Sequence, residues 1–150
     1  MKKKTPYLIV ITAILVIGAI AFFRPLSLVG NASGATEIKM FLNEMGIEDG
    51  KPEMDISEIY TLTSEQKTAL SDLQEDYTYR RTFSTPFSDG SISGLGDKLL
   101  YLYVYEGVEL TDCICISSSG KVAVNDKTYI MKNADQFIDK AVELMNMNAE

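Results

Sequence analysis

The chain contains no histidine, only two cysteines, and few basic residues for its length of 150. Without histidine, the sequence excludes serine–histidine and cysteine–histidine catalysis, and it lacks the most versatile metal-ligating side chain. Positive charge is also scarce, because 14 basic residues face 21 acidic ones and the formal net charge is −7. Such a surface repels phosphate backbones, so we expect no nucleic-acid partner.

Four of the 14 basic residues stand at the start of the chain. Three lysines at positions 2–4 precede a run without charge from Tyr7 to Phe23, which stops at Arg24. As a helix these 17 residues measure roughly 26 Å, near the lower limit for crossing a bilayer. The lysines outweigh Arg24, so the positive-inside rule puts the N-terminus in the cytoplasm and the rest of the chain outside. We therefore expect residues 1–24 to be a single-pass membrane anchor.

A cleavable signal peptide is the alternative, since it also has a basic start and an apolar middle. Its apolar middle is usually about 7–15 residues, and the run here is longer. If it were cleaved, the remainder would be secreted. Either way the remainder is exported, and without the four early cations residues 25–150 carry a net charge of −11. That charge argues against docking of the domain itself on anionic lipid.

The exported part divides into a short tether and one domain. Residues 25–35 are small and flexible, which is typical of a linker, and residues 36–150 are long enough to bury one core. A basic start, an apolar run and a small exported domain together resemble the layout of small single-pass extracytoplasmic proteins of Gram-positive bacteria. The resemblance implies a location at the cell envelope and assigns no role to any residue.

Apolar spacing predicts three helices in the domain. Apolar side chains recur at helical intervals from Ile38 to Met45, which predicts a first helix there. Thr63 is a candidate N-cap for a second helix, with Gln66 completing a capping box. A third helix is predicted over residues 133–147.

Short strands fill most of the remaining chain. Residues 56–63 and 77–83 alternate like strands, and tight turns join four more strands between residues 98 and 131. Residues 47–55 are predicted to form a loop. Because strands joined by short turns pair antiparallel, we expect an α+β fold: an antiparallel sheet of about five to six strands with helices packed on it.

Two neighbouring strands, residues 98–105 and 109–117, have faces of different chemistry. Because alternate residues share a face, aliphatic side chains fall on one side and tyrosines and cysteines on the other. Matching the aliphatic faces places Val104 opposite Leu110 and Tyr101 opposite Cys113. The candidate binding residues on the tyrosine–cysteine side, with two tyrosines of residues 77–83 added, are Tyr77, Tyr79, Tyr101, Tyr103, Tyr105, Cys113 and Cys115.

The two cysteines are separated by a single residue. In a strand their Cα atoms would be about 6.5–7 Å apart with parallel Cβ vectors, so a disulfide between Cys113 and Cys115 would be strained. Structural thiols are the favoured interpretation; intermolecular or redox pairing and a soft-metal site that recruits methionines stay open. We expect no bound metal and no cofactor.

Tyrosines are favoured on binding surfaces because they offer large, stiff, amphipathic contact area. The alternative is that the predicted helix over residues 38–45 covers this side of the sheet and half-buries it.

Two Ser-x-x-Lys spacings, Ser64–Lys67 and Ser118–Lys121, are the only catalytic pattern we find. Ser64 is better explained as a helix cap, and Ser118 is expected in a turn where the spacing gives no useful geometry. Arg80 and Arg81 point to opposite faces of a strand, so they cannot form one anion clamp.

The pattern therefore predicts a membrane-anchored, non-enzymatic domain that binds a protein or peptide at the cell envelope. Two alternatives are a structural or assembly subunit of a membrane complex, held through the apolar helix, and a small serine–lysine hydrolase.

Overall fold

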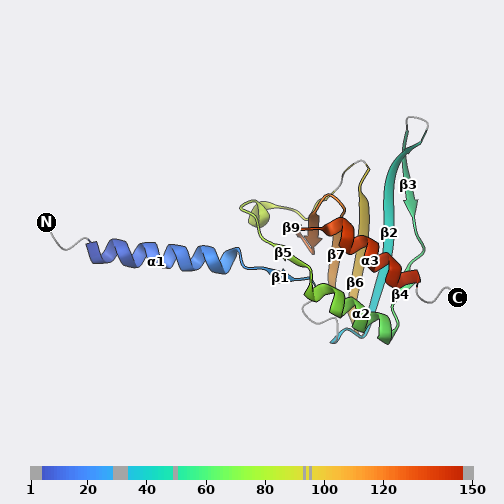
Figure 1. Ribbon diagram of the computed structural model, residues 1–150, viewed down its shortest axis with the longest axis horizontal. Helices are drawn as coiled ribbons and strands as arrows, with labels where there is room; N and C mark the ends of the chain where they lie inside the picture. The colour runs from blue at the N-terminus through green and yellow to red at the C-terminus, as the bar shows by residue number, and fades with distance from the viewer. Residues whose placement is uncertain (1–4, 29–33, 49–50, 93, 95, 147–150) are drawn as a thin grey trace.

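The computed structural model describes residues 5–28, 34–48, 51–92, 94 and 96–146 (Figure 1). Its architecture is α+β: one large antiparallel sheet carries two helices on one face, and a third helix extends away from the sheet (Figure 1). This confirms the predicted fold class and the antiparallel pairing. The sheet is larger than expected, because the described residues form nine strands rather than five or six.

The strands are β1 (Leu26–Ser27), β2 (Glu37–Glu48), β3 (Lys51–Ile56), β4 (Tyr60–Thr61), β5 (Thr78–Arg80), β6 (Lys98–Glu106), β7 (Glu109–Ser117), β8 (Lys121–Val124) and β9 (Lys127–Met131). Their order across the sheet is β1-β5-β9-β8-β7-β6-β2-β3, and β4 pairs with β2. One end of the sheet is therefore formed by β1 and β5, and the other end by β2, β3 and β4.

Helix α1 (Thr5–Phe22) forms where the sequence predicts an apolar helix and projects from the domain at the β1 end of the sheet (Figure 1). Among the helices of the described residues, none has the length and apolar content needed to cross a membrane. The prediction of a spanning anchor from Tyr7 to Phe23 is therefore not supported. Directly after the helix, Leu26 pairs with Tyr79 and Leu28 is buried, so the chain joins the sheet within a few residues.

The predicted helix over residues 38–45 is wrong, because these residues belong to the long strand β2. The short run fits both patterns: Ile38 and Met40 are fully buried, while Lys39 and Phe41, which alternate with them, face the other way. Pairing decides the outcome, since β2 is hydrogen-bonded to β6 from Glu37 to Glu44. The predicted loop over residues 47–55 is wrong in part, because β3 forms there and pairs with β2.

Helix α2 (Ser64–Glu75) begins as predicted. The Thr63 side chain accepts a hydrogen bond from the Gln66 amide, and the Gln66 side chain accepts one from the Thr63 amide, which completes the capping box. Helix α3 (Ala134–Asn146) confirms the C-terminal helix and packs beside α2. The Gln66 side-chain amide also donates to the Leu144 carbonyl at 2.6 Å, so the start of α2 is joined to the end of α3.

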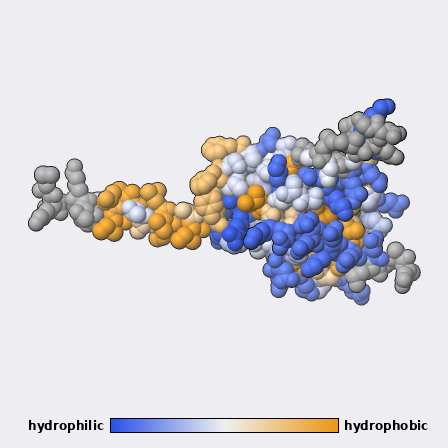
Figure 2. Space-filling model, turned by 45° about the horizontal axis from the view of Figure 1, so that its top comes forward, coloured by the Kyte–Doolittle hydropathy of each residue, from blue (hydrophilic) through white to orange (hydrophobic). Residues whose placement is uncertain are grey.

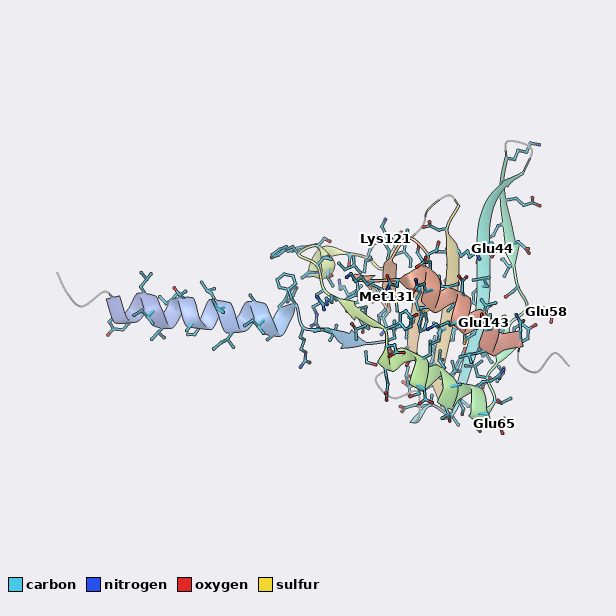
Figure 3. All side chains as sticks on the ribbon, in the orientation of Figure 1. Glu44, Glu58, Glu65, Lys121, Met131 and Glu143 are labelled. Carbon is cyan, nitrogen blue, oxygen red and sulfur yellow. The ribbon has the colours of Figure 1, made fainter. Side chains whose placement is uncertain are left out.

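The main core lies between these two helices and one face of the sheet (Figure 3). Phe137, Ile138 and Ala141 of α3 and Leu70 of α2 are fully buried against it. The sheet contributes aliphatic side chains from one face; those of β6 and β7 were predicted there from alternation, whereas those of β2 and β8 were not. They are Ile38, Met40, Leu100, Leu102, Val104, Ile114, Ile116 and Val122.

Strands β6 and β7 form the predicted hairpin, but their register differs from the prediction. Tyr101 lies opposite Cys115 and not Cys113, because the turn has two residues, Gly107 and Val108, in place of three. A β-bulge at Thr111 then shifts the pairing by one residue. From Leu99 to Val104 the two predicted faces are confirmed, because the register differs by an even number of residues. The predicted pair of Val104 and Leu110 is wrong: Val104 lies opposite Asp112, and Leu110 lies opposite Tyr105 and is 46% exposed.

Candidate functional site

The candidate site is the sheet face opposite α2 and α3, where alternation places the polar and aromatic side chains of β2, β6 and β7. We call it the tyrosine face. It consists of Lys39, Phe41, Tyr101, Tyr103, Tyr105, Cys113 and Cys115. Because residues 38–45 form a strand, the helix that was expected to cover this face does not exist.

Three aromatic rings form a row across β2 and β6. Phe41 stacks on Tyr101 with ring centroids 4.6 Å apart and planes only 2° from parallel. Tyr103 lies on the other side, with its centroid 5.8 Å from Phe41 and an interplanar angle of 27°. All three side chains remain partly exposed, so the row offers a stiff apolar surface to solvent.

Tyr105 extends the row toward the β6–β7 turn and carries charge beside it. The Lys39 ammonium lies 5.1 Å from the centre of its ring and also pairs with Glu37 at 3.1 Å. Beyond Tyr105, Glu106 and Glu109 are exposed and directly opposite each other. Alternation turns both of them toward the opposite face, and the carboxylate on the tyrosine face beside Tyr105 is that of Glu37.

The Tyr101 and Tyr103 hydroxyls keep their protons at neutral pH. Burial, followed by the neighbouring Cys115 sulfur, raises the pKa of Tyr101 to about 12. Burial and the neighbouring Cys113 also raise the pKa of Tyr103. Both phenols are therefore neutral hydrogen-bond donors, and the Tyr101 hydroxyl interacts with the Cys115 thiol.

Both cysteines are free, and they differ in accessibility. Cys115 is buried in a small cluster with Leu99 and Ala123, and that burial raises its pKa to about 11. Cys113 is only half-buried, and its pKa is raised by burial as well. Thiolates are the reactive form, so both side chains are poor nucleophiles at neutral pH.

A loop covers the part of this face that lies over β7 and β8. Ile92 packs on Leu99, Cys115 and Ala123. The same loop is closed by Asp97, whose carboxylate accepts hydrogen bonds from the Ser117 and Ser119 hydroxyls at 2.7 and 2.9 Å. The open part is therefore limited to the aromatic row, Tyr105 and Cys113.

Tyr77 and Tyr79 do not extend the tyrosine face. Tyr77 packs edge-on against Phe137 of α3 with centroids 5.3 Å apart, and Tyr79 packs against Tyr129 at 4.8 Å. Both are buried in the main core, on the side that the helices cover. Tyr79 lies in β5, and Tyr77 just before it has the same parity. The sequence offered no register between β5 and β6, because three strands, β9, β8 and β7, lie between them in the sheet.

Phe41 and Lys39 are the site residues that the sequence interpretation missed. Both were assigned to a helix, so neither was expected beside the tyrosines. The available signal was the alternation of Ile38, Lys39, Met40 and Phe41, which fits a strand as well as a helix.

The two serine–lysine pairs are engaged elsewhere. The Lys67 amine donates to the Ala35 and Thr36 carbonyls at 3.2 and 3.1 Å, away from the Ser64 position at the start of α2. The Ser118 hydroxyl accepts a hydrogen bond from the Lys98 amide at 3.0 Å, and Lys121 is exposed on β8.

Within the described part of the chain, no group of three or more acidic or cysteine side chains is placed to hold a metal ion. Comparison with protein-family models, curated protein sequences and solved structures gives no match to this chain. A proposal for its function therefore has to be argued from the geometry of the molecule.

Proposed function

We propose that this protein is a membrane-attached, non-enzymatic domain whose tyrosine face binds a protein or peptide outside the cytoplasm. The observation that carries the proposal is the aromatic row of Phe41, Tyr101 and Tyr103 on a sheet face that neither α2 nor α3 covers. Partly exposed aromatic side chains that stack in a fixed row are costly to leave in water and well suited to contact.

The face has the composition of a recognition surface. Tyrosine is enriched among the residues that dominate binding energy, since it buries much area with little loss of conformational entropy. The Phe41 stack fixes two of these tyrosines before any partner arrives. Their protonated hydroxyls supply donors for carbonyl groups of a bound chain.

Charge narrows the partner class. The hairpin end next to Tyr105 carries the exposed Glu106 and Glu109, which point to the opposite face, and residues 25–150 carry a net charge of −11. A partner with apolar side chains for the row and lysine or arginine for the acidic surroundings of the hairpin end would be complementary. We therefore propose a basic, partly apolar peptide segment or protein surface as the ligand.

Membrane attachment is proposed for α1. Its large apolar side chains from Tyr7 to Ile20 point in all directions and are exposed, from 52% for Val16 to 72% for Tyr7. A helix that is apolar on all sides requires apolar surroundings, which a lipid bilayer supplies. The lysines at 2–4 favour a cytoplasmic N-terminus and an external domain.

The absence of enzyme activity is part of the proposal. Lys67, the candidate base, is held by two backbone carbonyls rather than by Ser64. Labelling the protein with a broad serine-reactive probe should give no adduct at Ser64 or Ser118. An adduct at either serine would favour the hydrolase alternative.

Binding is tested with the full chain in membranes. The double variant Phe41→Ser, Tyr103→Ser should reduce capture of the partner at least tenfold, because it removes the centre of the aromatic row. The matched control is Glu143→Ser, on the exposed side of α3 (Figure 3). Equal capture by the double variant and the control, with both still folded by circular dichroism, would refute binding by the tyrosine face.

A helix exchange separates this proposal from an assembly role of α1 itself. Replacing residues 5–22 with an unrelated apolar helix should preserve partner capture if the tyrosine face binds. Loss of capture with the domain still attached to membranes would favour the alternative of a subunit held in a membrane complex through α1.

A further inference from the structure

A loop at the β1 end of the sheet exposes two phenylalanines. Phe83 is 83% exposed and precedes the short 3-10 helix η2 (Thr85–Phe87), and Phe87, its last residue, is 90% exposed. The loop that carries them is fixed to the domain. The Thr85 hydroxyl donates to the Thr128 carbonyl at 2.8 Å, and the Ser88 hydroxyl accepts from the Thr128 amide at 2.8 Å.

This loop lies against the end of α1. The Phe83 ring packs edge-on against Phe23 with centroids 4.8 Å apart, and Phe23 packs in turn against Phe22 at 4.9 Å. The Arg81 guanidinium lies 5.7 Å from the Phe22 ring and donates to the Phe22 carbonyl at 3.5 Å. Figure 2 shows the result as one apolar surface that continues from α1 onto the loop.

Positive charge gathers around the same end of the domain. Segments 22–28, 78–88 and 127–133 hold five basic residues and no acidic one, although residues 25–150 as a whole carry −11. Arg80 and Lys132 line a depression of about 300 Å³ together with Thr78, Ile130 and Met131. Ile130 is itself 52% exposed, so apolar and basic side chains alternate here.

We propose that this junction surface, formed by Phe83, Phe87, Ile130, Arg24, Arg80 and Lys132, docks on anionic phospholipid at the membrane from which α1 extends. Phe83 and Phe87 enter the headgroup–acyl boundary, and the basic side chains contact lipid phosphates. The occupant is lipid because the surface is continuous with α1 and opposite in charge to the rest of the domain. The inference rests on the membrane attachment proposed above.

Docking has a consequence for the tyrosine face. A single helix followed by a few residues would let the domain rotate relative to the membrane. Two inserted rings and a basic rim fix one orientation of the domain, and therefore of its tyrosine face, relative to the membrane surface. The overall negative charge of the domain argues against binding to anionic lipid. The positive charge is local to the β1 end, so this end can bind anionic lipid although the domain as a whole is negative.

Tryptophan probes test the docking directly, because the chain contains no tryptophan of its own. Phe83→Trp and Phe87→Trp are prepared in the full chain, in phosphatidylglycerol–phosphatidylcholine vesicles with brominated acyl chains. Ile59→Trp is the matched control, because Ile59 is 64% exposed next to β4, at the opposite end of the sheet. We expect at least half of the emission at 83 and 87 to be quenched and that at 59 to be unaffected.

The outcomes are distinguishable. If the chain floats with the vesicles but all three probes are equally unquenched, the docking inference is wrong and membrane attachment stands. If the chain does not float with the vesicles, membrane attachment itself fails and the inference fails with it. As a second arm, the double variant Arg80→Gln, Lys132→Gln is added to the Phe87→Trp chain. It should reduce quenching at position 87 at least twofold in anionic vesicles and leave quenching unchanged in vesicles of phosphatidylcholine alone. Quenching in anionic vesicles that equals that of the chain with Arg80 and Lys132 would refute the headgroup contacts.

Discussion

The two faces of the sheet are built from the same strands but have opposite surroundings. On one face, Leu100, Leu102 and Ile114 are no more than 1% exposed beneath α2 and α3. On the other, Tyr101 and Tyr103 alternate with these residues and remain partly open to solvent. The helices therefore decide which face stabilises the fold and which face is available for contact. Substitutions on the two faces should have correspondingly different effects.

The largest effect on stability is expected on the covered face. Phe137→Ala removes a fully buried ring that packs against Tyr77. It should lower the free energy of unfolding by about 3–5 kcal/mol, because it combines lost burial with a cavity. Urea denaturation followed by circular dichroism measures the change. A loss below about 1 kcal/mol would mean that α3 does not hold the sheet as described.

The tyrosine face should become unstable at high pH. Burial raises the pKa of Cys115 from 9.0 to about 11 and that of Tyr101 from 10.0 to about 12. A raised pKa means that the stabilisation is complete below the unfolded-state value and is lost as pH rises through the folded-state value. Unfolding free energy should thus be level up to about pH 9 and fall between about pH 9 and 12.

Cys115→Ala provides the control for that pH dependence. The variant lacks the buried thiol, so its decline between about pH 9 and 11 should be shallower than that of the unchanged chain. Cys113→Ala should keep most of the decline, because Cys113 is only half-buried. Identical pH profiles for the two variants would contradict the difference in burial.

A smaller effect is expected at the start of α2. Thr63→Ala breaks the capping box and should cost about 1 kcal/mol. Thr68→Ala is the matched control, since Thr68 lies exposed within the helix and alanine favours helix. The urea midpoints of the two variants are compared. Equal midpoints would show that the cap does not contribute to the stability of the fold.

The smallest effect is expected on the open face. Tyr105→Ser loses a partly exposed ring and its contact with Lys39, which should cost only about 0.5 kcal/mol. The same substitution should weaken partner binding much more than it weakens folding. A loss of several kcal/mol in urea denaturation would show that the tyrosine face belongs to the core.

Much of the fold could be predicted from the sequence because local patterns agreed with tertiary structure. The capping box at Thr63 and Gln66 is formed by neighbouring residues, and the two faces of β6 follow from strict alternation. Strand β2 was missed because its short apolar run fits both periodicities, and only pairing with β6 distinguishes them.

The candidate site was predictable in part. Tyr101, Tyr103 and Tyr105 share a face whatever the register, so the sequence sufficed to group them. The partner of each depends on the turn length and on the bulge at Thr111, which no local signal marked. The placement of Tyr77 and Tyr79 in the core depends on β5 pairing with β1 and β9, a long-range contact that alternation does not reveal.

Site-specific photo-crosslinking tests the central claim that the open face is the binding face. A photoreactive phenylalanine analogue replaces Tyr103 in one full-length variant and Glu143 on α3 in another, and both are irradiated in native membranes. The account predicts one discrete adduct from position 103 that disappears when Phe41→Ser is added, and no adduct from position 143. An adduct from 143 with none from 103 would contradict it.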